Sequence, residues 1–139
     1  IQSFEQANLI ALSKLTSVRL IQLIDANDVN PDGSLDFTAP FDRPYDWTAS
    51  GKPELLSRTF GHLTTDAGLK EVASYAYGIG PWKRYIVSTV ADAQGTGPGE
   101  AKLKLAEPTD LIERAPQLLV LQRLTAGLRD THSTILPQR

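Results

Sequence analysis

The chain has 139 residues, of which 41% are apolar and 22% charged, and its formal net charge is -2. These values suit one globular domain of modest size and exclude a disordered tail. The sequence has no cysteine, no long run of Lys or Arg, and no stretch near the ~18 consecutive apolar residues of a membrane span, so it also excludes disulfides, nucleic-acid binding and a membrane-spanning role.

The first 25 residues predict a strand, a helix and a second strand. The segment of residues 1–4 is short and apolar, as expected for a strand. Leucines recur at helical spacing over residues 6–15. Residues 18–25 are almost continuously apolar and β-branched, which is typical of a parallel strand covered on both faces. Because the chain contains no methionine and opens on Ile1, we expect its natural N-terminus to lie upstream.

A long loop is predicted next, over residues 25–53, because four prolines and repeated Asp, Asn and Gly interrupt any period. Loops of this length are uncommon and often functional. Residues 66–76 predict a helix with Thr65 as its N-cap, and Gly78 to Pro81 ends that helix and leaves room for a very short strand.

The last part of the chain predicts a turn at residues 95–99, a helix at residues 110–115 and a further strand at residues 118–122. Alternation of strands and helices indicates an α/β fold with a parallel sheet.

Residues 28–36 resemble the start of an EF-hand calcium loop. Oxygen-bearing side chains occupy its positions one, three, five and nine, and glycine its position six: Asp28, Asn30, Asp32, Asp36 and Gly33. However, Ala39 stands at position twelve, where calcium requires a bidentate Glu, and the preceding segment resembles a strand. The alternatives are a cation- or partner-binding loop and an Asx-rich turn whose side chains satisfy local backbone groups.

Other candidate residues carry weaker signals. His62 and His132 are too far apart in sequence for a standard metal-ligand pair, which favours surface or structural roles. Gln22 is the one uncharged polar residue in an apolar strand, so it either has hydrogen-bond partners in a core or faces a polar pocket. Asp25 ends that strand, and ligands of parallel α/β folds bind beyond the carboxyl ends of strands.

Four segments in register resemble the glycerophosphodiester phosphodiesterase family: residues 1–5 (Ile-Gln-Ser-Phe-Glu), 20–24 (Leu-Ile-Gln-Leu-Ile), 45–47 (Tyr-Asp-Trp) and 75–81 (Tyr-Ala-Tyr-Gly-Ile-Gly-Pro). The resemblance covers residues 1–115. It implies that this part is the C-terminal half of the family's domain, and that residues 116–139 are a divergent or mis-framed tail.

The resemblance implies a partial TIM (β/α)8 barrel, with residues 1–4, 18–25 and the Gly78 region as roughly its fifth to seventh strands. The family hydrolyses glycerophosphodiesters to glycerol 3-phosphate and an alcohol, a reaction of lipid metabolism. It uses two histidines and a divalent cation, calcium or magnesium, held by carboxylates on earlier strands. We therefore assign no catalytic and no metal-binding residue here, and expect the fragment alone to be inactive and to hold no cation.

Three residues carry over from the family as substrate-binding groups. Phe4 resembles the aromatic residue that packs on the glycerol end, Gln22 a polar lining residue, and Trp47 an aromatic wall. Trp82 would add a second wall, although large aromatic residues more often anchor cores or loops. Tyr77 departs from the family, which usually has Asp before the Gly-Ile-Gly-Pro turn.

Overall fold

The computed structural model describes residues 1–97 and 102–115, which form a mixed α/β arrangement with three small, open sheets. The elements in chain order are β1 (Gln2–Ser3), α1 (Gln6–Ser13), β2 (Ile21–Ile24), β3 (Asp28–Val29), β4 (Leu35–Asp36), α2 (Tyr45–Ser50), α3 (Pro53–Leu56), the 3-10 helix η1 (Phe60–Thr64), α4 (Asp66–Ala73), β5 (Gly78–Pro81), the 3-10 helix η2 (Lys83–Tyr85), β6 (Thr89–Ala91), β7 (Leu103–Leu105) and α5 (Leu111–Arg114).

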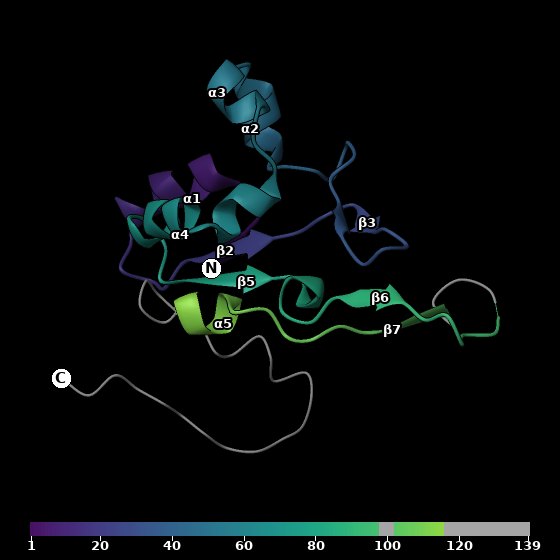
Figure 1. Cartoon of the computed structure of the whole chain (residues 1–139). Helices are drawn as coiled ribbons and strands as arrows, with labels where there is room; N and C mark the ends of the chain where they lie inside the picture. Colours follow the sequence, from purple (N-terminus) through teal and green to yellow (C-terminus); the bar gives the residue numbers. More distant parts are fainter. Residues whose placement is uncertain (98–101, 116–139) are drawn as a thin grey trace.

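The central sheet is parallel, and its strand order β1-β2-β5 follows the sequence. Gln2 pairs with Ile21, and Gln22 pairs with Ile79. Figure 1 shows α1 and α4 on the same side of this sheet. The predicted strands at residues 1–4 and 18–25 are therefore present, although both are shorter than their apolar runs.

The helices form where local signals and apolar spacing agree. Thr65 caps α4 as predicted, because its hydroxyl accepts a hydrogen bond from the N–H of Gly68 at 3.1 Å. Leu69 and Val72 face inward from α4 and are buried with Leu9 of α1. Ile24 of β2 belongs to the same hydrophobic cluster, and both Gln22 and Ile24 are at most 1% exposed.

One hydrophobic cluster joins the sheet to its helices. Its members are Leu9, Leu20, Ile24, Ala26, Trp47, Phe60, Leu63, Leu69, Val72, Tyr75, Ala76, Ile79, Tyr85, Leu111 and Ala115. The cluster extends to α5, which lies beside the start of α4. Arg114 donates to the carbonyl of Thr64 at 3.1 Å and pairs with Asp66 at 2.8 Å.

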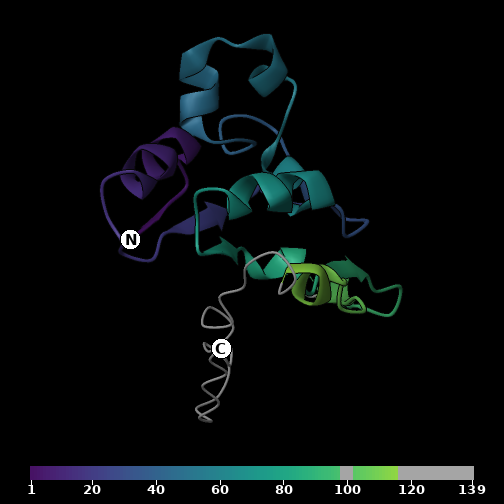
Figure 2. The same ribbon diagram turned by 90° about the vertical axis from the view of Figure 1, so that its left-hand side faces the viewer.

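The prediction of a structureless loop over residues 25–53 is wrong. The segment contains the antiparallel β3–β4 hairpin and the helix α2. The strands of the hairpin are two residues each, which is too short to show a period in the sequence. Both views show α2 and α3 projecting above α1 and α4 (Figures 1 and 2).

A second antiparallel hairpin, β6–β7, was not predicted. The predicted turn at residues 95–99 falls between its strands, and only residues 95–97 of that turn are described. The predicted helix at residues 110–115 is present as α5. The predicted strand at residues 118–122, the tail 116–139 and His132 lie outside the described residues.

Candidate functional site

A cleft of about 690 Å³ lies between the two hairpins, at the carboxyl ends of β2 and β5. Figure 1 shows β3 beyond the end of β2, and β6 beyond the end of β5. The first hairpin lines the cleft with Asp28 and Val29, and the chain after β5 lines it with Trp82. This volume falls within the roughly 300–1,000 Å³ of small-molecule sites, and the position is where parallel α/β folds bind ligands.

The β3–β4 hairpin is held by its own polar side chains. Asp32 accepts hydrogen bonds from the N–H and the hydroxyl of Ser34, at 2.9 and 2.7 Å. Asp36 accepts from the side chains of Asn27 and Thr38, at 2.7 and 2.8 Å. The side-chain hydrogen bond from Ser34 lowers the pKa of Asp32, and those from Asn27 and Thr38 lower the pKa of Asp36.

The two hairpins meet at Gly33. The hydroxyl of Ser88 donates a hydrogen bond to the carbonyl of Gly33. Gly33 has φ +88°, and a Cβ atom there would lie 1.8 Å from the carbonyl oxygen of Thr89. Glycine at this position therefore permits both the left-handed backbone and the close approach of the two hairpins.

Charged and polar groups of the second hairpin complete the cleft. Thr89 and Asp92 belong to β6 and the turn after it, and Lys102 precedes β7. Arg84, from η2, also lines the cleft and has interaction partners of its own. The hydroxyl of Thr89 is buried and makes no hydrogen bond within the described part of the chain. The lining of the cleft thus combines charges of both signs with an indole ring.

A separate polar network lies under the helices. Gln6 accepts a hydrogen bond from the indole N–H of Trp47 at 2.8 Å and donates to Glu71 at 2.9 Å. Glu71 also lies 3.3 Å from both Arg58 and the Nε2 atom of His62. His62 is therefore half-buried between an acidic partner and the Trp47 ring, whose centroid lies 6.4 Å from its own. These contacts give His62 a structural role, one of the two roles that the sequence favoured.

Gln22 has core partners, which is the first of its two predicted alternatives. Its amide donates to the carbonyls of Phe4 and Leu23, at 2.9 and 3.0 Å, and its carbonyl accepts from the hydroxyl of Tyr75 at 2.8 Å. Burial, with the nearby charges of Glu71 and Asp46, raises the pKa of Tyr75 well above its ordinary range. The phenol therefore remains a neutral donor.

The helices α1 and α2 cap each other's N-termini across a long sequence separation. Glu5 accepts hydrogen bonds from the N–H groups of Tyr45 and Asp46, at 3.3 and 2.6 Å, and the carboxylate of Asp46 accepts from the N–H of Ala7. Together with the Gln6–Trp47 bond, this contact joins two of the segments on which the family resemblance rests.

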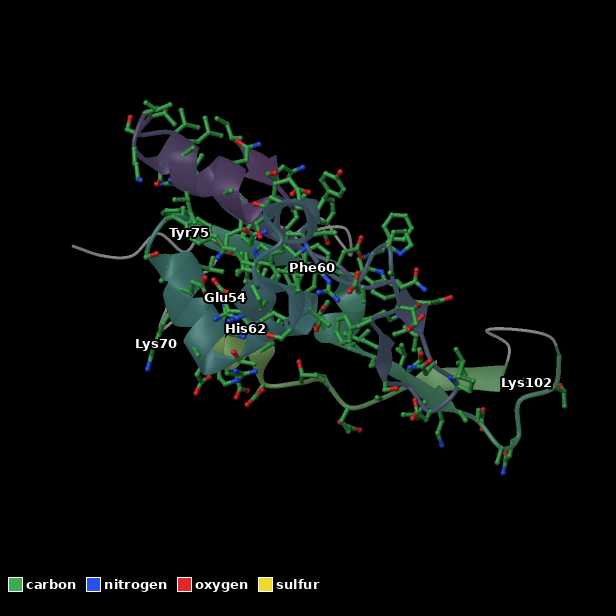
Figure 3. The ribbon with its side chains drawn as sticks, turned by 90° about the horizontal axis from the view of Figure 1, so that it is seen from above. Glu54, Phe60, His62, Lys70, Tyr75 and Lys102 are labelled. Carbon is green, nitrogen blue, oxygen red and sulfur yellow. The ribbon has the colours of Figure 1, made fainter. Side chains whose placement is uncertain are left out.

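The predicted substrate-binding residues lie around this helical layer, and none of them lines the cleft. Phe4 is 42% exposed, and its ring meets Phe60 edge-on at 6.1 Å, whereas Gln22 and Trp47 are 0% and 1% exposed. Figure 3 shows Phe60, His62 and Tyr75 together and Lys102 at the far end of the molecule. The binding roles of Phe4, Gln22 and Trp47 stay predictions.

Trp82, which the resemblance offered as a second wall, lines this cleft and also packs against the hydrophobic cluster. Thr89, Asp92 and Lys102 also line the cleft, and no motif in the sequence indicates them. Tyr77 lies just before β5, at the amino ends of the strands, where the guanidinium of Arg19 stacks on its ring at 4.4 Å. Its departure from the family pattern is therefore remote from the cleft.

The described residues supply no evident metal centre. Over residues 1–97 and 102–115, no three His, Cys, Asp or Glu side chains are grouped so that they could hold a metal ion. The divalent cation that the resemblance implies thus has no matching ligand set in this part of the protein. No helix in the same ranges has the length and apolar character needed to cross a membrane.

No protein-family model matches the chain, and no solved structure matches it significantly.

Proposed function

We propose that this chain is the C-terminal part of a glycerophosphodiester phosphodiesterase barrel, and that the complete protein hydrolyses glycerophosphodiesters to glycerol 3-phosphate and an alcohol. The observation that carries the proposal is the order of the parallel strands. The strands β1, β2 and β5 are neighbours in sequence order, with α1 and α4 on one face. Consecutive strands with their helices on the outer face are the repeat of a TIM barrel.

Two further features agree with this proposal. The helix α5 continues the helical layer, because Arg114 bonds to the start of α4. On the opposite face of β2, Ile21 and Leu23 are only half-buried, although both are large and apolar. In a complete barrel, this face would be covered by the layers of side chains that fill the interior.

In this proposal the catalytic groups of the enzyme lie upstream of Ile1. Hydrolysis of the diester requires a base that activates the attacking oxygen and a cation that balances the phosphate charge. Within the described ranges, His62 is engaged with Glu71 and lies away from the cleft. The fragment alone is therefore expected to be inactive.

The test is hydrolysis of glycerophosphocholine with added calcium or magnesium, by this chain and by a version extended upstream from the native gene. Activity in the extended protein alone supports the proposal. Activity in the short chain would show that the catalytic groups lie within the 139 residues, contrary to the proposal. Inactivity of both proteins would reject the assigned reaction.

The alternative is a non-enzymatic module that binds a cation or a partner through residues 28–36. The hydrogen bonds of Asp32 and Asp36 favour the Asx-rich turn instead, because both carboxylates already accept from neighbouring side chains. Calcium titration distinguishes the two: a change in tryptophan fluorescence or melting temperature would support the cation-binding module.

A further inference from the structure

The β6–β7 hairpin is held by main-chain bonds that define its two edges. Figure 1 shows the hairpin extending away from the central sheet. The N–H of Ala106 donates to the carbonyl of Ser88 at 2.9 Å, and the N–H of Asp92 donates to the carbonyl of Lys102 at 2.6 Å. Because hydrogen-bonded pairs alternate along an antiparallel ladder, these two bonds fix which residues direct their main-chain groups to the partner strand.

Leu103 and Leu105 present their main-chain groups on the outer edge of β7. Val90 and Lys104 pair midway between the two bonds, so Lys104 directs its main-chain groups to β6. The N–H and C=O groups of Leu103 and Leu105 point to the opposite side, and no hydrogen bond engages them within residues 1–97 and 102–115. This edge can therefore pair with a further extended strand.

The outer edge of β6 is less accessible than that of β7. The hydroxyl of Ser88 donates to the carbonyl of Gly33, and a Cβ atom on Gly33 would lie 1.8 Å from the carbonyl oxygen of Thr89. The first hairpin thus lies against β6. On β7, by contrast, Lys104 is exposed and the side chain of Leu105 is 70% exposed.

The side chains along β7 differ between its two faces. Lys102 and Lys104 lie on one face, because alternate residues of a strand point the same way, and Leu103 and Leu105 lie on the other. Both lysines are exposed, and neither forms an ion pair with a described residue. Directly opposite side chains of an added strand would have their Cβ atoms about 4.5–5.5 Å away. Carboxylates opposite the lysines would therefore complement this edge.

A second copy of the chain fits this edge poorly. The antiparallel register that pairs Leu103 with Leu105 of the other copy would use the main-chain groups of both residues. The same register places the two Lys104 side chains directly opposite each other, and like charges in that position are destabilising. Edge lysines of this kind oppose self-pairing, whereas an acidic strand meets no such repulsion.

We propose that the outer edge of β7 binds an extended acidic peptide segment of a partner protein by strand addition. The peptide backbone bonds to Leu103 and Leu105, and its carboxylates lie opposite Lys104 and Lys102. Main-chain bonds supply affinity in this mode of recognition, and alternate side chains supply specificity. This inference goes beyond the proposed function, because it concerns a protein partner and requires no hydrolysis.

The first experiment titrates the 139-residue chain into two fluorescein-labelled peptides, Val-Glu-Val-Glu-Val and Val-Lys-Val-Lys-Val, and follows fluorescence anisotropy. The acidic peptide should bind at least about fivefold more tightly at low salt, and added salt should reduce the difference. Equal affinity for the two peptides, or no binding of the acidic one, would overturn the proposal. Sedimentation that shows a dimer lost in Leu105→Pro would assign the edge to a second copy instead.

The second experiment tests the main-chain bonds. Leu105→Pro removes an outward N–H and leaves the bonds of Lys104 to β6, because proline is tolerated at strand edges. Affinity for the acidic peptide should fall by about three- to tenfold. Leu105→Ala is the matched control: it shortens the side chain, keeps the N–H and should retain more of the affinity. Equal affinities of the two variants would refute strand addition.

The third experiment reverses the charge preference. Lys104→Glu should weaken binding of the acidic peptide and strengthen binding of the basic one, each by about two- to tenfold. Loss of the hairpin structure cannot produce such a reversal, because it would weaken both. Lys70→Glu on α4, at an exposed position, is the control and should change neither affinity. Weaker binding of both peptides by Lys104→Glu, or no change, would contradict the assigned face.

Discussion

Replacement of Gly33 by alanine tests the contact between the two hairpins. The new Cβ atom would lie 1.8 Å from the carbonyl oxygen of Thr89 and 3.0 Å from the side chain of Val90. Since backbone atoms cannot rotate away as a side chain can, one hairpin must shift, at a cost of about 1–3 kcal/mol. The left-handed conformation at φ +88° adds about 1–2 kcal/mol for a residue with a Cβ atom. We expect a total loss of about 2–5 kcal/mol.

Gly51→Ala is the matched control, because Gly51 has a positive φ of 65° and no atom lies within 4 Å of the position that a Cβ atom would take. It carries only the backbone cost, partly offset by the reduced entropy of the unfolded chain, so we expect a loss of about 1 kcal/mol or less. Urea unfolding followed by tryptophan fluorescence measures both variants. Equal destabilisation by the two would refute the argument from close approach.

The remaining predictions concern the helical layer and the first hairpin. Gly68→Ala should destabilise by about 1–3 kcal/mol in urea unfolding, despite the better helix propensity of alanine, because its Cβ atom would lie 2.0 Å from a backbone oxygen of η1. Tyr75→Phe should cost about 1–3 kcal/mol, because it leaves the buried carbonyl of Gln22 without its donor, whereas Tyr45→Phe, at an exposed site, should cost almost nothing. The pKa of Asp36 is lowered below its ordinary 3.8. The ionised carboxylate therefore stabilises the fold fully above that pH, and this stabilisation is lost as the pH falls through the folded-state pKa. Asp36→Asn should accordingly reduce the loss of thermal stability below about pH 4.

Much of the fold could be predicted wherever the signal is local. The apolar run around β2, the Thr65 cap of α4 and the glycine-rich strand β5 each reflect residues that are adjacent in sequence. The helix α2 could not be predicted in this way, because its N-terminus is capped by Glu5, 41 residues before Asp46. A contact of that range leaves no pattern within a local window.

The candidate site was harder to predict than the fold. For Trp82 the sequence left a pocket wall and a core or loop anchor open, and Thr89 belongs to a three-residue strand whose sequence carries no motif. The place of Thr89 in the lining of the cleft depends on the packing of the two hairpins. Such properties arise from tertiary structure and have no counterpart in a single sequence.

Gly33 is compatible with both interpretations of residues 28–36, the calcium loop and the Asx-rich turn. In a calcium loop, glycine at the sixth position permits a sharp turn around the ion. Here the same residue permits a left-handed turn in a hairpin and the approach of Thr89 to its backbone. The neighbouring carboxylates bond to Ser34, Asn27 and Thr38 instead of a cation. The motif therefore sets the contact between the two hairpins, and a substitution at Gly33 should disturb that contact even if every carboxylate of the motif is unchanged.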